Sequence, residues 1–434
     1  MNKKIKILSG LFSSVLFLPL VAASCNKSQK KDDDKTQSDA PNNSPESQNN
    51  KDKKTWDSIW NDSISGYDIG RDNDDYKEVE ETKETIMQNI KNADEIKKIV
   101  SEYKDSFATF HTQQDFLDQI NVFAKEKKIE NLVLRHKRYA NKNLLKDENG
   151  GKNKITLRLG NYIFDVQLGK VDTFVATKYY LKDDDSKKII EHKEKNFDTL
   201  NKMNKKIVIT QIGYSLENGF GKNNTTVKIK TLPKHTIEVP KQLPLKIESL
   251  YEAFKYLESE RVENLNLWDL KNIRSIAEMF SNAKNFNQDI SDWNTMNIRN
   301  MSGLFDAAGA FNKPLNKWNV SNVTQMGDMF AGTKAFNQDL NDWDTKNVFD
   351  MESMFHEAEK FNGKIDKWNV KNVKKMSLMF ADASAFSHDL SKWEINSNLD
   401  VTGMFKGINY KFLDAVSTKW KIDKNKFEKN DFKK

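Results

Sequence analysis

The chain has 434 residues, of which 37% are hydrophobic and 31% charged, and its formal net charge is +7. A mean hydropathy of -0.77 excludes a protein that lies mostly within a membrane, and 26 Phe with 9 Trp exclude a chain that is disordered throughout. The length is enough for about two or three domains, each able to bury a core of its own.

The first 24 residues have the pattern of an export signal. Lysines precede an apolar stretch over residues 7–21, and small residues lead into Cys25. Cys25 is the only cysteine, so the chain forms no disulfide within itself. An uncleaved membrane helix is the alternative, but the apolar stretch is short for one.

The position of Cys25 resembles the lipobox of bacterial lipoproteins, although Ala22 stands where that motif usually has leucine. The resemblance implies that residues 1–24 are removed and that the Cys25 thiol carries two acyl chains. Two chains hold a protein on a bilayer stably, whereas one chain does not. We therefore expect a lipid-anchored protein on the extracellular face of the cell membrane, with the membrane as a partner through acylated Cys25.

Residues 25–55 predict a lipidated cysteine followed by a disordered linker. After Cys25 this segment has no aromatic residue and no aliphatic residue larger than Ala40. Such a sequence cannot bury enough apolar surface to offset the entropy of ordering it. We expect a tether that holds the folded part away from the bilayer.

Residues 56–240 predict an α+β domain. Apolar residues recur at helical spacing over residues 56–148, and short runs of β-branched and aromatic residues fill residues 153–240. No complete catalytic motif occurs there. A surface hydrolase with its site in residues 56–240 is our second hypothesis, and it requires acids and histidines to converge on one pocket.

Weak motifs elsewhere do not add up to a catalytic site. Residues 219–222 lack the earlier glycine and the following Ser or Thr of a phosphate loop, so we interpret them as a hairpin turn. His356 and Glu357 are followed by Lys360, where a zinc-protease helix needs a second histidine. Three aspartates at residues 183–185 are more typical of a solvated loop than of a cation site. We expect no metal, no cofactor and no enzymatic activity.

The second half of the chain repeats with a period of 25 residues. Three aromatic columns and one aliphatic column keep this period, and the tryptophan column consists of Trp268, Trp293, Trp318, Trp343, Trp368 and Trp393. Such regularity is typical of stacked coils, because each unit buries its large residues only against its neighbours. We expect these tryptophans to form the repeat core. An exposed platform for stacking sugars or bases is the alternative.

Within each coil we expect a strand and then a short helix. The strand pattern of leucine-rich repeats is matched around Trp393, and the apolar spacing after Asn372 is that of one helix face. Asn372 and its equivalents either cap the helix or form a ladder between coils. The predicted fold class is α+β, ending in a leucine-rich-repeat-like α/β solenoid over residues 244–420 and a basic tail over residues 421–434.

Residues 244–420 resemble the BspA-like leucine-rich repeats of mycoplasma surface lipoproteins. The unit Trp-Asn-Val-x-Asn-Val-x-x-Met-x-x-Met-Phe-x-x-Ala-x-x-Phe-Asn is nearly intact from Trp318 to Asn337. This resemblance implies a surface recognition role, since related proteins are regarded as adhesins, but it implies no particular ligand.

If each tryptophan points inward, its neighbours along a strand point outward. The binding face that we expect consists of Asp292, Asn294, Lys317, Asn319, Asp342, Asp344, Lys346, Lys367, Asn369 and Lys371. We expect this face to recognise a host or extracellular protein by contact. Besides the hydrolase, a purely structural or antigenic coat protein is an alternative, and the oligomeric state stays open.

The net positive charge does not lie in the repeats. Residues 246–420 hold 21 Lys and Arg against 24 Asp and Glu, a net of −3. The repeated half is therefore not a basic platform, and we expect no nucleic-acid partner.

Overall fold

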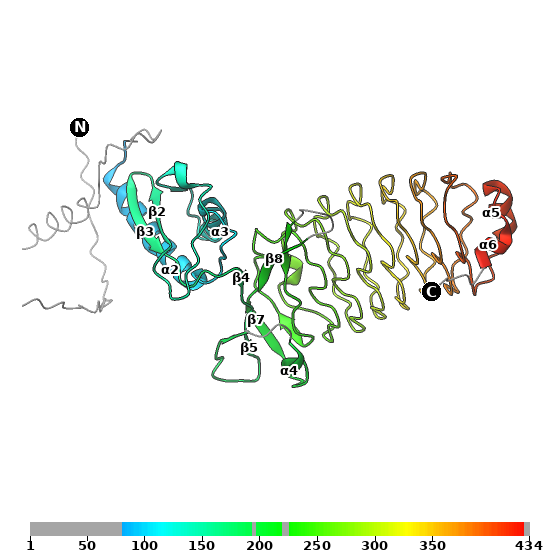
Figure 1. Cartoon of the computed structure of the whole chain (residues 1–434), viewed down its shortest axis with the longest axis horizontal. Helices are drawn as coiled ribbons and strands as arrows, with labels where there is room; N and C mark the ends of the chain where they lie inside the picture. Colours follow the sequence, from blue (N-terminus) through cyan, green and yellow to red (C-terminus); the bar gives the residue numbers. More distant parts are fainter. Residues whose placement is uncertain (1–79, 193–196, 219–224, 429–434) are drawn as a thin grey trace, which may run out of the picture. The chain divides into compact units, whose positions relative to one another are not determined.

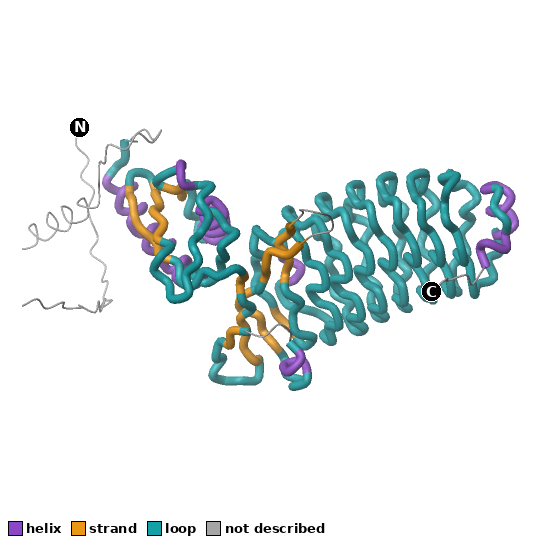
Figure 2. Tube along the Cα trace, viewed as in Figure 1, coloured by secondary structure: helices purple, strands orange, loops and turns teal. Residues whose placement is uncertain are grey.

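The computed structural model describes residues 80–192, 197–218 and 225–428, and it contains both helices and small sheets (Figure 1, Figure 2). The α+β prediction is confirmed at this level. The predicted export signal, Cys25 and the linker lie outside the described residues.

The first described part pairs two helices with an antiparallel sheet. The helices are α2 (Lys83–Tyr103) and α3 (Gln113–Glu126). The sheet has the order β1-β2-β3, and its strands are β1 (Leu132–Leu134), β2 (Lys154–Leu159) and β3 (Tyr162–Gln167), with the 3-10 helix η1 (Lys137–Tyr139) after β1. Thr112 and Asp115 form a capping box that begins α3. The apolar faces of these elements enclose one core, which includes Phe116, Ile120 and Leu157.

Two further small sheets follow. Their strands, with the one-turn helix α4 (Asp198–Asn201) between β6 and β7, are β4 (Phe174–Val175), β5 (Lys178–Leu181), β6 (Ile190–Glu191), β7 (Ile207–Gln211), β8 (Tyr214–Asn218), β9 (Thr225–Ile229) and β10 (Thr236–Glu238). One sheet has the order β10-β7-β5-β6 and the other β4-β8-β9. Strands β8 and β9 pair antiparallel, and the last pair is Asn218 with Thr225. The turn predicted at residues 219–222 lies outside the described residues.

The strands of residues 174–238 belong to the core of the repeats and not to that of the helices. One continuous apolar cluster contains Ala108 and then runs from Val175 to Phe427, while the cluster around α2 and α3 ends at Val171. Parallel bridges continue from β9 and β10 into the first coil, joining Lys228 to Ser249 and Glu238 to Glu263. The predicted domain over residues 56–240 is therefore divided near residue 172, because the strands that follow pack on the first coil.

Successive 25-residue coils lie side by side from residue 249 onward (Figure 1). Single parallel bridges join neighbouring coils at Ser249–Ser275, Ser275–Asn300, Asn300–Gln325, Gln325–Asp350, Asp350–Lys375 and Lys375–Asp400. After each bridge, every second backbone N–H donates to the next coil, as Ile276 does to Asn300 and Glu278 to Ser302. The coils are thus joined by their own backbone along one side.

The strand predicted at each tryptophan and the helix predicted after it are wrong. Residues 268–412 contain no helix, and the backbone pairing there consists of single bridges (Figure 2). In the segment predicted as a helix, Leu378 and Asp382 have φ of 55° and 57°, which a right-handed helix does not allow. N–H groups therefore alternate between their own coil, as in Met379 to Met376, and the next one. The apolar residues still face inward, but a chain of turns positions them.

Aromatic columns fill the interior of the coils. All six repeat tryptophans are buried, with 2 to 4% of each residue exposed. The rings stack between coils: Phe330 and Phe355 are 5.5 Å apart with 5° between their planes, and Trp343 and Trp368 are 6.1 Å apart with 2°. The tryptophans therefore belong to the core and are not an exposed stacking platform.

Two short helices close the last coil. They are α5 (Leu413–Trp420) and α6 (Lys424–Glu428). Phe427 is fully buried, and its carbonyl accepts the N–H of Phe405. At the equivalent Phe380, a carbonyl of the following coil accepts this N–H. The folded part therefore continues to at least residue 428, beyond the boundary predicted at residue 420.

Candidate interaction surface

All ten residues of the predicted binding face are exposed. They lie in turns around the buried tryptophans and not on a parallel sheet, because the bridged side of each coil begins seven residues after the tryptophan. We call them the tryptophan-flanking face. It has three columns: one before the tryptophan, one directly after it, and one three residues after it.

Side chains in the column directly after the tryptophan stabilise the backbone turn at that point. The side-chain oxygen of Asn319 accepts the N–H of Ser321 at 3.0 Å, and that of Asn369 accepts the N–H of Lys371 at 3.2 Å. Asn and Asp favour such turns because their short side chains hydrogen-bond the backbone two residues on. Asn294, Asn319, Asp344 and Asn369 are thus exposed but have a structural role.

Asn372 and its equivalents form an asparagine column. Of the two roles considered from the sequence, a helix cap or a ladder between coils, the column forms the ladder. Asn322 donates its side-chain N–H to the carbonyl of Met296 at 2.8 Å, and Asn347 donates to Ser321 at 2.6 Å. Asn372 donates to Lys346 at 2.7 Å and caps no helix. Each asparagine therefore ties its coil to the preceding one.

The column before the tryptophan has no such role. Lys317 and Asp292 form an ion pair of 3.0 Å between coils, but 67% and 86% of their side chains are exposed, so it contributes at most about 1 kcal/mol. Within the described part of the chain, the side chains of Asp342 and Lys367 have no hydrogen-bond or ion-pair partner. The side chains of this column therefore stabilise no turn and can vary at little cost in stability.

A stripe of carboxylates on the bridged side of the coils has no counterpart in the sequence predictions. It consists of Glu278, Asp306, Asp328, Asp350 and Glu352. Burial raises the pKa of Asp328 to about 6, and the charge of Asp306 adds to the effect. Glu278 and Asp328 share one position of the repeat, two coils apart, but Asp306, Asp350 and Glu352 each occupy another, so no single column in the sequence contains the stripe. Among the described residues, no group of three His, Cys, Asp or Glu is placed to hold a metal ion.

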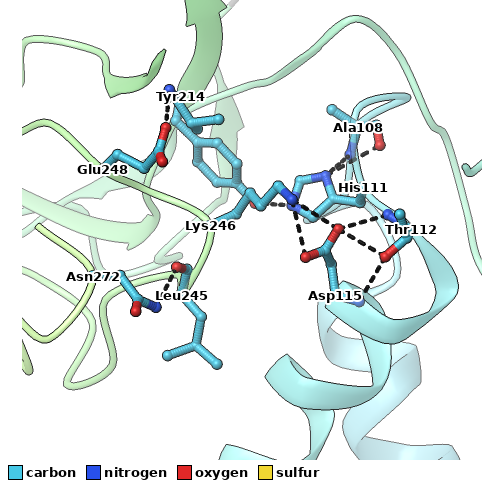
Figure 3. A network of polar contacts seen from close by, with 10 residues as sticks. Ala108, His111, Thr112, Asp115, Tyr214, Leu245, Lys246, Glu248 and Asn272 are labelled. Carbon is cyan, nitrogen blue, oxygen red and sulfur yellow. Dashed lines mark hydrogen bonds and ion pairs between the residues drawn. The ribbon is translucent and has the colours of Figure 1, made fainter. Parts of the chain in front are cut away.

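A polar junction joins α3 to the segment that leads into the repeats (Figure 3). Lys246 binds both carboxylate oxygens of Asp115, at 2.9 and 3.0 Å. Beside this pair, the buried His111 accepts the N–H of Ala108 through Nδ1, which leaves Nε2 to donate to the Tyr214 hydroxyl at 3.2 Å. Burial lowers the pKa of His111 to about 4, so the ring is neutral near pH 7.

Acidic residues and one histidine do meet in a cleft of about 340 Å³ in the middle of the chain. The titratable residues that line it are Asp105, Asp147, Glu148, Lys170, Asp172, Lys178, Glu191 and His192. Burial works against ionisation of Asp105, but hydrogen bonds from Lys178 and the Lys170 N–H outweigh it and lower its pKa. Asp147 accepts the N–H groups of Asn149, Gly150 and Lys152 and holds a turn.

The remaining candidate residues have structural surroundings or lie elsewhere. Within residues 183–185, Asp184 accepts the N–H and hydroxyl of Ser186 and forms a turn. His356 lies 3.8 Å from both Glu357 and Asp382 on the coil surface. Cys25 is outside the described residues. Among those described, no helix has the length and apolar character needed to cross a bilayer.

One family model matches the chain, over the coils and the closing helices. Residues 248–355 and 338–434 match the family described as Mycoplasma protein of unknown function, DUF285. This part of the chain is similar to mycoplasma proteins of unknown function. Together the two matches begin at the first bridged coil and run past α6, so they cover the part with the 25-residue period. No curated protein and no solved structure matches the chain.

Proposed function

We propose that this chain is a lipid-anchored protein of the extracellular face of a cell membrane. Its coils, a solenoid of the BspA-like leucine-rich-repeat kind, recognise a host or extracellular protein by contact. The sequence around Cys25 supports the anchor, and the match to mycoplasma proteins of unknown function agrees with a bacterial surface protein.

The column before each tryptophan carries the recognition proposal. The tryptophans themselves are buried and the residues directly after them hydrogen-bond the backbone, whereas Asp292, Lys317, Asp342 and Lys367 alternate in charge and stabilise no turn. A regular fold with one freely variable exposed column is suited to binding, because residues there change without loss of stability. The inward columns are apolar, so no acid, base or nucleophile recurs in them, and we propose no catalysis, cofactor or nucleic acid.

Fatty-acid labelling tests the anchor. Cells that express the full chain are grown with radioactive palmitate, and the chain is then isolated. We expect label on the wild type and none on Cys25→Ser, because the thiol is the only attachment point of this kind. Equal labelling of the two chains contradicts the anchor.

Charge reversal tests recognition. The full chain with Cys25→Ser is immobilised and exposed to a panel of purified extracellular matrix proteins. A partner that uses the tryptophan-flanking face should bind the double variant Lys317→Glu and Lys367→Glu at least about tenfold more weakly, since like charges then oppose each other across the contact. The control is Lys284→Glu with Lys360→Glu, which reverses two exposed lysines in other columns.

The acidic cleft favours a second candidate, a surface hydrolase. Paired carboxylates and a histidine are the groups that general acid–base hydrolysis uses. Turnover of chromogenic ester, glycoside or peptide substrates by the full chain, lost in both Asp172→Asn and Glu191→Gln, would establish it. If no matrix protein binds and no substrate is turned over, the coat-protein alternative remains.

A further inference from the structure

We propose that the cleft between β8–β9 and the first two coils binds an acidic peptide segment, with Arg274 and Arg299 holding its carboxylates. This inference rests on the proposed recognition of a protein partner and adds to the tryptophan-flanking face a second contact site with a ligand chemistry of its own. The cleft holds about 500 Å³, which is within the range of pockets that take a small ligand or a short peptide.

The lining of the cleft is mixed in the way that a peptide site requires. Its apolar wall comes from Phe110, Leu216, Val227 and Leu245, and its polar residues are Thr225, Lys246, Glu248, Lys271, Asn272, Arg274 and Asn297. Leu216 is 46% exposed, so it leaves apolar surface on this wall for a ligand side chain. Figure 3 shows Leu245, Lys246, Glu248 and Asn272 of this cleft close to the junction with α3.

Most charges in the cleft already have partners. Lys246 is bound by Asp115, and Glu248 accepts the N–H of Val227 at 3.1 Å. Lys271 lies 3.4 Å from Asp269, in a pair whose side chains are about half exposed. In the described part of the chain, Arg274 has no side-chain partner. Its guanidinium is therefore the free cation of the cleft wall.

Arg299 extends this positive charge by one coil. The N–H of Arg299 donates to the carbonyl of Arg274 at 2.8 Å, so the two residues occupy the same position in adjacent coils. Both are exposed, and the side chain of Arg299 also has no partner among the described residues. Two guanidinium groups at adjacent positions suit carboxylates, because each forms paired, parallel hydrogen bonds to one.

Amide groups beside the arginines suit a peptide backbone. Asn272 and Asn297 donate their side-chain N–H groups to Leu245 and Lys271, and no described residue donates to their side-chain oxygens. These two oxygens, one per coil, can accept backbone N–H groups of an extended ligand. Donors for carboxylates and acceptors for amides thus lie next to each other.

The basic stretch is too short to favour a nucleic acid. After Arg299 the same column continues with Thr324, Phe349 and Lys374, so the adjacent cations end after two coils. Nucleic-acid binding relies on a positive track that follows many phosphates. Two adjacent arginines beside an apolar wall match a ligand with a few carboxylates and apolar side chains.

Fluorescence anisotropy tests the proposal on the full chain with Cys25→Ser. The probe is a fluorescein-labelled hexapeptide, Glu-Leu-Glu-Glu-Leu-Glu, and the control peptide has Gln in place of each Glu. We expect the acidic probe to bind with a Kd below about 1 mM at low salt, and the amide peptide at least about tenfold more weakly.

Substitutions locate the site. Arg274→Gln with Arg299→Gln should raise the Kd at least about tenfold, and Arg274→Lys should raise it by a smaller factor because the ammonium cannot form paired bonds. Lys374→Gln, in the same column and distant from the cleft, should leave the Kd within about twofold. Thermal melting of each variant should match the wild type, since these side chains have no partners in the fold.

Three results would overturn the proposal: an unchanged Kd for the double arginine variant, equal binding of the Gln peptide, or tighter binding of oligothymidine than of the acidic probe. Failure of this site is distinguishable from failure of the proposed function. The charge reversals at Lys317 and Lys367 should leave probe binding unchanged, and binding of a matrix protein through that face does not require the cleft.

Discussion

The indole N–H of Trp343 donates a 2.9 Å hydrogen bond to the main-chain carbonyl of Leu315, which lies in the preceding coil. The same bond recurs at Trp293, Trp318 and Trp368. Each of these four tryptophans thus fills the core of its coil and also donates to a main-chain carbonyl of its neighbour. The side chain couples two coils by packing and by a hydrogen bond at once.

Replacement of Trp343 by alanine should lower the free energy of unfolding by about 3 to 5 kcal/mol, because it opens a cavity and leaves the Leu315 carbonyl without its donor. Trp343→Phe keeps much of the packing but loses the bond, so we expect about 1 to 3 kcal/mol. Urea unfolding of the full chain measures both. Asp342→Ala is the surface control and should stay within about 0.5 kcal/mol; a Trp343→Ala chain equally stable to it would contradict the coupling.

The asparagine ladder predicts that Asn347→Asp lowers stability to an extent that depends on pH. Asn347→Asp replaces the N–H that reaches the Ser321 carbonyl with a carboxylate oxygen, so two acceptors then face each other. We expect a loss of about 1 to 3 kcal/mol at pH 7, partly recovered at pH 3, where a protonated Asp regains a donor. Unfolding at both pH values tests this. Lys346→Ala is the neighbouring control, and a destabilisation of the same size there would mean that the ladder contributes nothing specific.

His111 should make the junction sensitive to acid. Its pKa is about 4 in the fold and 6.5 in the unfolded chain, so the unfolded chain takes up a proton first as the pH falls. The contribution of neutral His111 is complete above pH 6.5 and is lost as the pH falls towards 4, by about 2 to 4 kcal/mol.

Urea unfolding between pH 7 and pH 4 measures this loss. His111→Gln cannot take up the proton, so its stability should fall less over the same range, although it is lower at pH 7. If the wild type and His111→Gln lost stability equally over this pH range, other groups would account for the acid sensitivity.

The pH dependence of stability that arises from Asp328 should have the opposite sign to that from His111. Burial raises its pKa to about 6, so the folded chain holds this proton more tightly than the unfolded one, and stability falls as the pH rises from about 4 to 6. Asp328→Asn removes the charge, and Asn also tolerates the φ of 55° found here. Because more than a third of the residue is nevertheless exposed to solvent, we expect a gain of less than about 1 kcal/mol at pH 7 that disappears below pH 4.

Thermal melting at pH 7 and pH 3.5 checks the Asp328 prediction. Asp342→Asn, in the next coil and outside the carboxylate stripe, controls for the loss of one negative charge. A larger effect of Asp328→Asn at pH 3.5 than at pH 7 would show that repulsion within the stripe is not its cause.

The sequence by itself determined the period, the core and the outward residues of the repeats. Large residues recurring every 25 positions are buried only if copies of the same turn stack, so Trp343 and its equivalents had to be inside. The exposure of Asp342 and Lys367 follows from the same register. What the pattern did not determine is the backbone conformation, because inward spacing of three and four is shared by a helix and by a chain of turns.

Only the tertiary structure decided how the coils are joined and which polar groups meet. The left-handed residues Leu378 and Asp382 are stable because their N–H groups bond to the next coil, an interaction that no local pattern encodes. Asp115 and Lys246 are far apart in the sequence and pair only after α3 and the first coil have packed. Arg274 and Arg299 likewise become neighbours through stacking, since a distance of 25 residues along the chain becomes one hydrogen-bonded step between coils.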